Sequence, residues 1–132
     1  MSLKIRVITP DRIVWNTSAD EVVLPSTSGQ IGILPNHAPL ITTLEIGVLR
    51  LKFEGNWKPI IVLGGFAEIE DDEIIILVNG VEEIISSDLG EVKSAVEKAS
   101  ENLSNAQTDK EKIEGSQNLK KAAARLQAIS FL

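Results

Sequence analysis

The feature that most constrains the fold is a change of hydrophobic period near residues 86–88. Before it, apolar and polar residues alternate with a period of two, as in residues 3–7, which is typical of half-buried strands. After it, apolar residues return at alternating steps of three and four, the spacing of one face of an amphipathic helix. We therefore expect an α+β chain with an N-terminal antiparallel β-sandwich domain, residues 1–86, and a C-terminal antiparallel two-helix hairpin domain, residues 87–132.

Short runs with strand character follow one another in the first part of the chain. The tight turns that separate them are signalled at Asp71-Asp72 and at Asn79-Gly80, which predicts a type I′ turn between two paired strands. Gly64-Gly65 predicts a bulge or a tight bend, where glycine permits unusual dihedrals. Many short strands at close spacing favour a sandwich or a flattened barrel. The predicted strands are residues 3–7, 13–15, 21–24, 47–53, 57–63, 66–69, 73–78 and 81–85.

Two helices are predicted after the change of period. Ser87 or Asp88 can cap the first helix, with Glu91 in capping-box spacing from Asp88, and Thr108-Asp109 offers a second turn and cap. Gly115 lies inside the second helix, where glycine costs about 1 kcal/mol relative to alanine. We therefore expect a hairpin of low stability that can leave its docked position. The alternative is a permanently packed hairpin that only stabilises the domain. Its apolar stripes are Leu89, Val92, Val96, Ala99, Leu103 and Ala106, then Ile113, Leu119, Ala122, Ala123, Leu126 and Ile129.

Composition excludes several classes of function. The chain has no cysteine and a single histidine, His37, so thiolate zinc sites, cysteine nucleophiles and multi-histidine metal sites are all excluded. A formal net charge of −6 disfavours non-specific nucleic-acid binding. The longest apolar runs, such as residues 74–78, are far shorter than the roughly 18 residues of a membrane-spanning helix. We expect no metal, no cofactor and no targeting segment before the first strand.

The tail carries a local excess of positive charge. After Ser116 the chain holds Lys120, Lys121 and Arg125 and no carboxylate side chain, so this end can bind an acidic partner. The simpler alternative is that these cations form only the solvated face of a helix.

The stretch Gly29-Gln30-Ile31-Gly32-Ile33-Leu34-Pro35-Asn36-His37-Ala38-Pro39 is the most unusual in the chain. It lacks the lysine of a phosphate-binding loop and opens no helix, so a rigid surface loop between strands is expected. His37 could act as a general base, but no nucleophile or acid is identified beside it, and a role in fixing the loop or contacting a partner is favoured. The acidic residues 68–73 lack calcium-loop spacing and indicate a solvated hairpin edge.

Together, these motifs resemble a known family. Residues 29–39 are similar to the signature loop of the epsilon subunit of F-type ATP synthases, and Gly64-Gly65-Phe66-Ala67 stands where that family has its second glycine motif. Residues 9–15, Thr-Pro-Asp-Arg-Ile-Val-Trp, resemble the chloroplast and cyanobacterial branch. The likeness covers essentially the whole chain, including the order of sandwich and hairpin.

The resemblance implies a non-catalytic central-stalk subunit of a proton-translocating enzyme complex. Such a subunit couples gamma to the membrane rotor ring, and its helices extend toward the catalytic alpha and beta subunits to inhibit ATP hydrolysis. By match of position, Gln30 and His37 are candidates for the rotor interface. Lys120, Lys121 and Arg125 are candidates for contact with the catalytic head. The implied location is the thylakoid membrane, peripheral, on the stromal or cytoplasmic side.

One motif departs from the family. Some bacterial members bind ATP through Ile/Leu-Asp-x-x-Arg-Ala at the start of the first C-terminal helix, where this chain has Leu89-Gly90-Glu91-Val92-Lys93-Ser94. Glycine replaces the aspartate, and lysine cannot reproduce the planar fork of arginine. We expect ATP binding by the isolated chain to be weak or absent.

Two other functions remain open from the sequence. The chain could be a free-standing β-sandwich binding module whose helices form a dimerisation arm, in which case gamma would not copurify with it. It could also be a small hydrolase that uses His37 with a carboxylate distant in sequence, in which case activity would be lost with His37→Ala.

Overall fold

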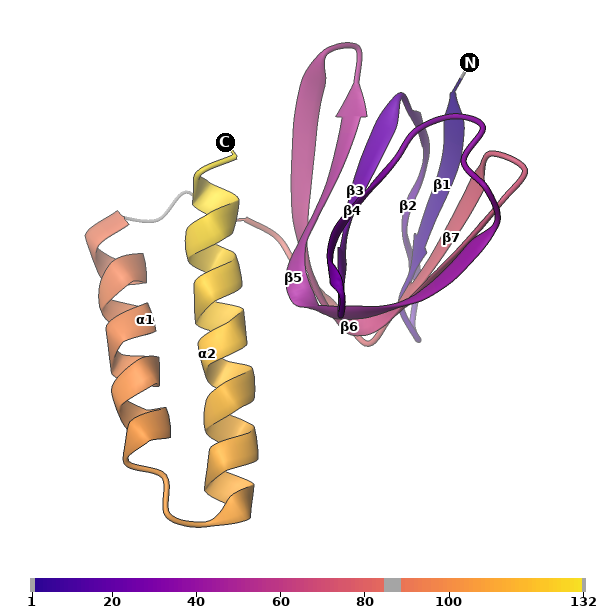
Figure 1. Cartoon of the computed structure of the whole chain (residues 1–132). Coiled ribbons are helices and arrows are strands. Elements are labelled where there is room, and N and C mark those ends of the chain that lie inside the picture. Colours follow the sequence, from indigo (N-terminus) through magenta and orange to yellow (C-terminus); the bar gives the residue numbers. More distant parts are fainter. Residues whose placement is uncertain (1, 85–88, 132) are drawn as a thin grey trace.

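The computed structural model describes residues 2–84 and 89–131, in which a folded β-sheet is followed by two long helices (Figure 1). The strands and helices are β1 (Leu3–Ile8), β2 (Ile13–Ala19), β3 (Glu21–Ser26), β4 (Gly29–Ile33), β5 (Leu40–Phe53), β6 (Asn56–Glu70), β7 (Glu73–Val78), β8 (Val81–Glu82), α1 (Leu89–Ser104) and α2 (Asp109–Ile129).

The two longest strands, β5 and β6, hold the sandwich together. They pair antiparallel from Leu40↔Ile69 to Phe53↔Asn56, so they form one long hairpin. The strand order is β2-β1-β7-β6-β5-β3-β4, and β8 pairs with β6 outside this path. The second half of β6 pairs with β7 and its first half with β8, so the sheet folds over and both layers share β5 and β6.

The bend in β6 falls at Gly64-Gly65. Their φ angles are 79° and 150°, which confirms the unusual dihedrals predicted there. A Cβ atom on Gly65 would lie 2.0 Å from the carbonyl oxygen of Leu77, so only glycine lets β6 approach β7 this closely. The bend in β6 therefore requires glycine at position 65.

The main hydrophobic core lies between the two layers. Strand β1 shows the predicted alternation, with Leu3, Ile5 and Val7 fully buried and the residues between them facing outward. Strand β7 likewise buries Ile74 and Ile76. Among the described residues, none of those in this core belongs to a helix, so the sandwich has its own interior without the hairpin. The other large side chains of this core with almost no exposure are Val22, Leu24, Ile33, Leu49, Val62 and Ile69.

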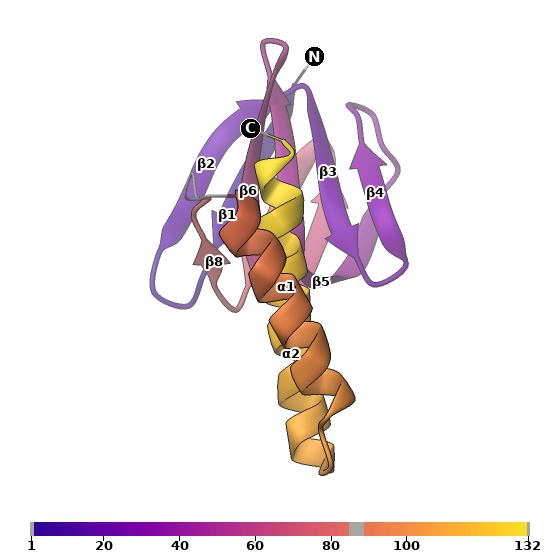
Figure 2. The same ribbon diagram turned by 90° about the vertical axis from the view of Figure 1, so that its left-hand side faces the viewer.

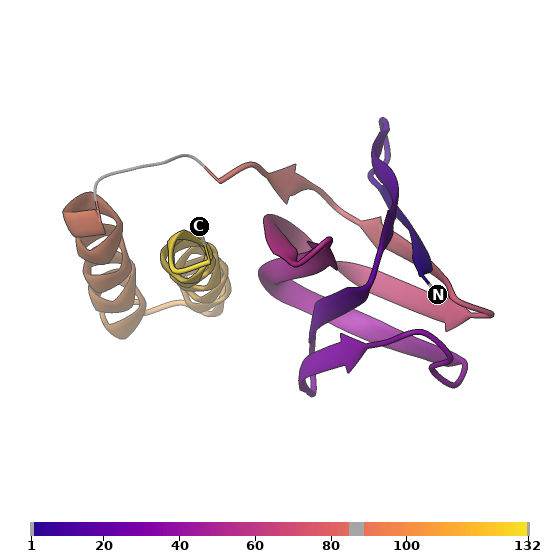
Figure 3. The same cartoon turned by 90° about the horizontal axis from the view of Figure 1, so that it is seen from above.

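The helices form the predicted antiparallel hairpin, in which α2 packs on β5 and β6 and lies between the sheet and α1 (Figures 2 and 3). The cap predicted at Thr108 is confirmed, because its side-chain oxygen accepts a hydrogen bond of 3.1 Å from the Glu111 amide. Gly115 is buried where the helices approach, and a Cβ atom there would lie 3.3 Å from the Cα atom of Leu103. Helix α1 packs on α2 and buries none of its residues.

Four features differ from the sequence predictions. Residues 29–33 form strand β4, paired antiparallel with β3, and are not part of a loop. At Asn79-Gly80 neither residue has a positive φ, and β8 pairs with β6 instead of returning along β7, so the type I′ hairpin prediction is wrong. The sandwich is also not purely antiparallel, since β1 and β7 run parallel.

The fourth difference concerns strand lengths. The runs predicted at 57–63 and 66–69 are two halves of β6, because the glycine bend changes the direction of the strand without ending its pairing with β5. The strand predicted at 81–85 is shorter than expected, because β8 ends at Glu82 and the described residues 83–84 are not part of it. Residue 85 of that run and the proposed caps at Ser87 and Asp88 lie outside the described residues.

Candidate functional site

The surface on which α2 docks is the candidate site, because it holds the predicted head-contact residues. Ala124 and Ala128 of α2 are buried against Val48 of β5 and Ile61 of β6. Alanine has no side chain beyond Cβ, so the helix can lie close to the sheet. Leu63, Ile84 and Phe131 complete this small apolar cluster, which is separate from the core of the sandwich.

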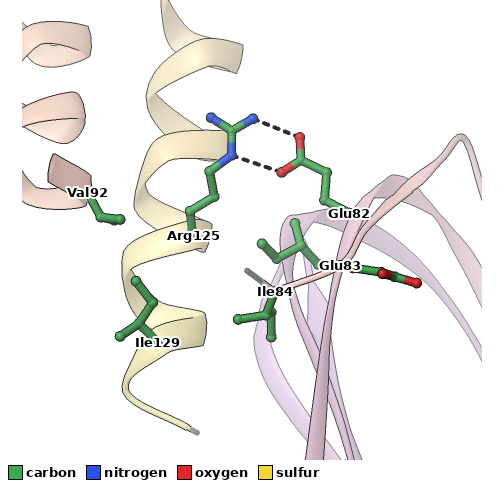
Figure 4. Close-up of a pocket in the computed structure, with 7 residues that line it drawn as sticks. Glu82, Glu83, Ile84, Val92, Arg125 and Ile129 are labelled. Atoms are coloured by element: carbon green, nitrogen blue, oxygen red, sulfur yellow. Dashed lines mark hydrogen bonds and ion pairs between the residues drawn. The ribbon is translucent and has the colours of Figure 1, made fainter. Parts of the chain in front are cut away.

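Arg125 forms a two-point contact with Glu82 across this interface (Figure 4). Its Nε donates to Glu82 Oε2 at 2.9 Å and its Nη2 donates to Glu82 Oε1 at 2.8 Å. The hydrogen bonds from Arg125 lower the pKa of Glu82 below its ordinary value of 4.5, and they raise the pKa of Arg125. Strand β8 therefore places a carboxylate where α2 presents its guanidinium.

Lys120 makes a second contact of the same kind. Its Nζ lies 3.0 Å from Glu45 Oε2 on β5, with both side chains about half exposed, so water screens this pair. Lys121 forms no ion pair within the part of the chain that the structure describes, although its charge helps to lower the pKa of Glu82. Two of the three predicted head-contact cations are thus paired with carboxylates of the sandwich.

An aromatic contact at the end of α2 was not predicted from the sequence. The guanidinium carbon of Arg50, on β5, lies 4.1 Å from the ring centroid of Phe131 and 5.1 Å from that of Trp57, on β6. Arg50 Nε is buried with no hydrogen bond to any described residue, so the two rings form its surroundings. The only sequence signal was an aromatic residue just beyond the last helix.

A small pocket of about 120 Å³ lies between α1, α2 and the chain around β8 (Figure 4). Its walls are mostly apolar, and its one cation, Arg125, is already bound to Glu82. Lys93, on α1, is exposed and not part of its lining. The residues that line the pocket are Ile61, Glu82, Glu83, Ile84, Val92, Arg125 and Ile129. Within residues 2–84 and 89–131, no group of His, Asp or Glu side chains could hold a metal ion.

The two predicted rotor-interface residues lie at opposite ends of β4. Gln30 is exposed and pairs with Pro25 next to the β3–β4 turn, whereas His37 follows the other end of the strand. The loop around His37 is tied to the β6–β7 turn, because the Asn36 amide donates a hydrogen bond of 2.6 Å to Asp72 Oδ1. The structure thus gives the loop a fixed shape but does not bring Gln30 and His37 together.

The hydrogen bonds that His37 forms with described residues all lie within its own loop. Its Nδ1 lies 2.6 Å from the carbonyl oxygen of Ala38, which accepts the hydrogen bond, and its amide donates to the carbonyl oxygen of Leu34 at 3.2 Å. Among the described residues, no carboxylate or nucleophile forms a hydrogen bond with its side chain. This geometry fits a loop-fixing residue better than a general base.

No described helix has the length and hydrophobicity needed to cross a membrane.

Comparisons with known proteins cover both parts of the chain. Residues 2–84 match the family described as ATP synthase, Delta/Epsilon chain, beta-sandwich domain. Residues 88–130 match ATP synthase, Delta/Epsilon chain, long alpha-helix domain.

Individual relatives agree with these matches. The chain is 56% identical to the chloroplastic ATP synthase epsilon chain of Pylaiella littoralis, over 100% of both chains. It is 54% identical to that of Gracilaria tenuistipitata var. liui, over 100% of this chain and 98% of the relative.

A solved structure shares the fold. A chain in the mitochondrial ATP synthase of Euglena gracilis (OSCP/F1/c-ring) superimposes with a TM-score of 0.82 at 20% identity, over 96% of this chain and 80% of that one. The resemblance drawn from residues 29–39 and 64–67 is therefore confirmed. The chain belongs to the delta/epsilon chain family of ATP synthases.

Proposed function

We propose that this chain is the epsilon subunit of a proton-translocating F-type ATP synthase, where it couples gamma to the membrane rotor ring and restrains ATP hydrolysis through its helices. The observation that carries the proposal is the full-length similarity to chloroplastic epsilon chains, together with a helical hairpin that rests on the sandwich mainly through α2. Such a hairpin breaks few stabilising interactions when it leaves the sandwich.

The interface between hairpin and sandwich is small, which supports a mobile role. Its apolar part has four buried residues, two of them alanines, and three partly buried ones, so it buries much less apolar surface than the main core. Its two ion pairs are partly exposed and contribute roughly 0–1 kcal/mol each. A partner that offers α2 comparable contacts can therefore compete with the sandwich for the hairpin.

We assign the parts of the chain as follows. Residues 1–86 form the anchor on gamma and the rotor ring, with Gln30 and His37 as candidate contacts. Residues 87–132 form the inhibitory arm, with Lys120, Lys121 and Arg125 as candidate contacts to acidic surfaces of the catalytic alpha and beta subunits. Because relatives are chloroplastic chains, the expected location is the thylakoid membrane, peripheral, on the stromal or cytoplasmic side.

The chain itself is proposed to have no active site and no cofactor. His37 has no catalytic partner within hydrogen-bonding distance among the described residues. At the start of α1, the residues Gly90 and Lys93 replace the aspartate and arginine of the nucleotide-binding pattern. Arg125, the cation in the nearby pocket of about 120 Å³, is already bound to Glu82.

The experiment that tests this function uses a catalytic head complex depleted of its epsilon subunit. Adding the full chain should lower ATP hydrolysis, and adding Lys120→Ala/Lys121→Ala/Arg125→Ala should leave hydrolysis largely uninhibited while the variant still binds gamma. Inhibition by the triple variant equal to that by the full chain would remove these three residues from the proposal. The alternative, a free-standing module with a dimerisation arm, predicts neither binding to gamma nor inhibition.

A further inference from the structure

We infer that Glu82 and Glu45 act as an internal substitute for the acidic partner of α2, so that docking on the sandwich and contact with the partner exclude each other. This inference rests on the proposed function, and it identifies how the inhibitory surface is held inactive. The cations concerned are Arg125 and Lys120.

The geometry at Glu82 carries the argument. The carboxylate of Glu82 accepts from Arg125 at 2.8 and 2.9 Å, which uses both of its oxygens and the Nε and Nη2 edge of the guanidinium (Figure 4). Arginine binds a planar carboxylate best through such a two-point edge. An aspartate or glutamate of another protein would need this same edge, so it competes directly with Glu82.

Lys120 also binds a carboxylate of the sandwich, but one on a different strand. Its ammonium lies 3.0 Å from Glu45 on β5, whereas Glu82 is on β8, so the two carboxylates reach α2 from separate parts of the sheet. Both cations therefore lose their carboxylates when α2 lifts away. The undocked helix presents Lys120, Lys121 and Arg125 with no carboxylate side chain of its own after Ser116. The partner that fits this surface presents at least two carboxylates to one helix face.

The first measurement uses the isolated full-length chain. Because it contains no cysteine, Gln117→Cys on α2 and Lys58→Cys on β6, both at exposed positions, accept a pair of spin labels without other changes. The distance distribution between the labels then reports the ratio of undocked to docked hairpin. Glu82→Gln combined with Glu45→Gln should raise this ratio about three- to tenfold, since each pair is partly exposed. Glu83→Gln is the matched control, because Glu83 adjoins Glu82 but forms no ion pair with a described residue.

A charge swap separates docking from partner contact. Glu82→Arg combined with Arg125→Glu should dock about as well as the native chain, because the pair is restored in reverse. The swapped α2 now offers a carboxylate at residue 125, so it should inhibit ATP hydrolysis by the epsilon-depleted head severalfold less than the native chain. Glu82→Gln, by contrast, should inhibit severalfold more strongly than Glu83→Gln.

Two results would overturn the inference. One is an unchanged docked fraction in the Glu82→Gln/Glu45→Gln chain. The other is equal inhibition by Glu82→Gln and Glu83→Gln when the first undocks and the second does not. Absence of inhibition by the native chain would instead contradict the proposed function, and the label distances in the isolated chain would still decide whether the two carboxylates hold the hairpin.

Discussion

Arg125 on α2 and Glu82 on β8 are joined by two hydrogen bonds of 2.9 and 2.8 Å, although 43 residues separate them in the chain. This contact joins β8, the last strand of the sandwich, to α2. Its position explains why a strand of only two residues, β8, matters: pairing of β8 with Ile61 and Val62 of β6 fixes Glu82 in front of α2.

The first prediction concerns pH. Since Arg125 lowers the pKa of Glu82, the docked state is stabilised by this pair above the ordinary glutamate value of 4.5, and that stabilisation is lost as the pH falls through the lowered pKa. After allowing for solvent screening, it should amount to at most about 1 kcal/mol. The carboxyl carbon shift of Glu82, followed by NMR, should titrate with a midpoint below 4.5. In Arg125→Gln the midpoint should move up toward the ordinary value, and identical midpoints in both chains would contradict the pairing.

The second prediction concerns the aromatic contact at the end of α2. Phe131→Ala removes one of the two rings around Arg50, so it should destabilise the docked last turn by roughly 1 kcal/mol. Amide hydrogen exchange should become severalfold faster in the last turn of α2. Ile113→Ala is the control on the same helix, because Ile113 is 61% exposed, and it should leave exchange in the last turn unchanged. Equal exchange in both variants would mean that Phe131 does not hold the helix.

The third prediction concerns the bend of β6. In Gly65→Ala the new Cβ would lie 2.0 Å from the Leu77 carbonyl oxygen at a φ of 150°, so the free energy of unfolding should fall by roughly 2–4 kcal/mol. Gly29→Ala is the control, since Gly29 also has a positive φ, 113°, but has open space around it. That variant should lose only the cost of backbone strain, roughly 1–3 kcal/mol, and therefore less than Gly65→Ala. Urea unfolding curves measure both values, and similar losses would show that backbone strain, not contact with β7, requires glycine.

The fourth prediction concerns nucleotide. Titration calorimetry of the isolated chain with ATP should show no binding in the micromolar range, because Gly90 and Lys93 depart from the binding pattern and Arg125 is bound to Glu82. Glu83→Gln should behave identically, since that residue has no part in the pairing. A micromolar Kd for the native chain would refute the expectation.

Periodicity in the sequence was sufficient to predict the general fold. The alternation at Leu3, Ile5 and Val7 and the three-four stripe after residue 88 are local signals, and local signals determine strands and helices well. The prediction failed where strand pairing depends on residues that are distant in the sequence. Asn79-Gly80 has the residues of a tight hairpin turn, yet Val81 pairs with Val62, a neighbour that only the folded sheet supplies.

The candidate site was predictable in part for the same reason. Lys120, Lys121 and Arg125 could be singled out because charge is visible in sequence. Their partners Glu45 and Glu82 could not, because nothing local distinguishes these two among the acidic residues of the sandwich. Arg50, between Phe131 and Trp57, was missed since its neighbours are 81 and 7 positions away in the numbering. The assignment of Gln30 and His37 to a rotor interface stays a prediction.

The most direct test of the account is ATP hydrolysis by an epsilon-depleted catalytic head complex, titrated with the full chain and with a chain that ends at Ser87. The sandwich has a core without helix residues, so the shortened chain should fold and bind. The full chain should lower hydrolysis, whereas the shortened chain should bind the complex and leave hydrolysis unchanged. Equal inhibition by both chains, or binding by neither, would contradict the proposed function.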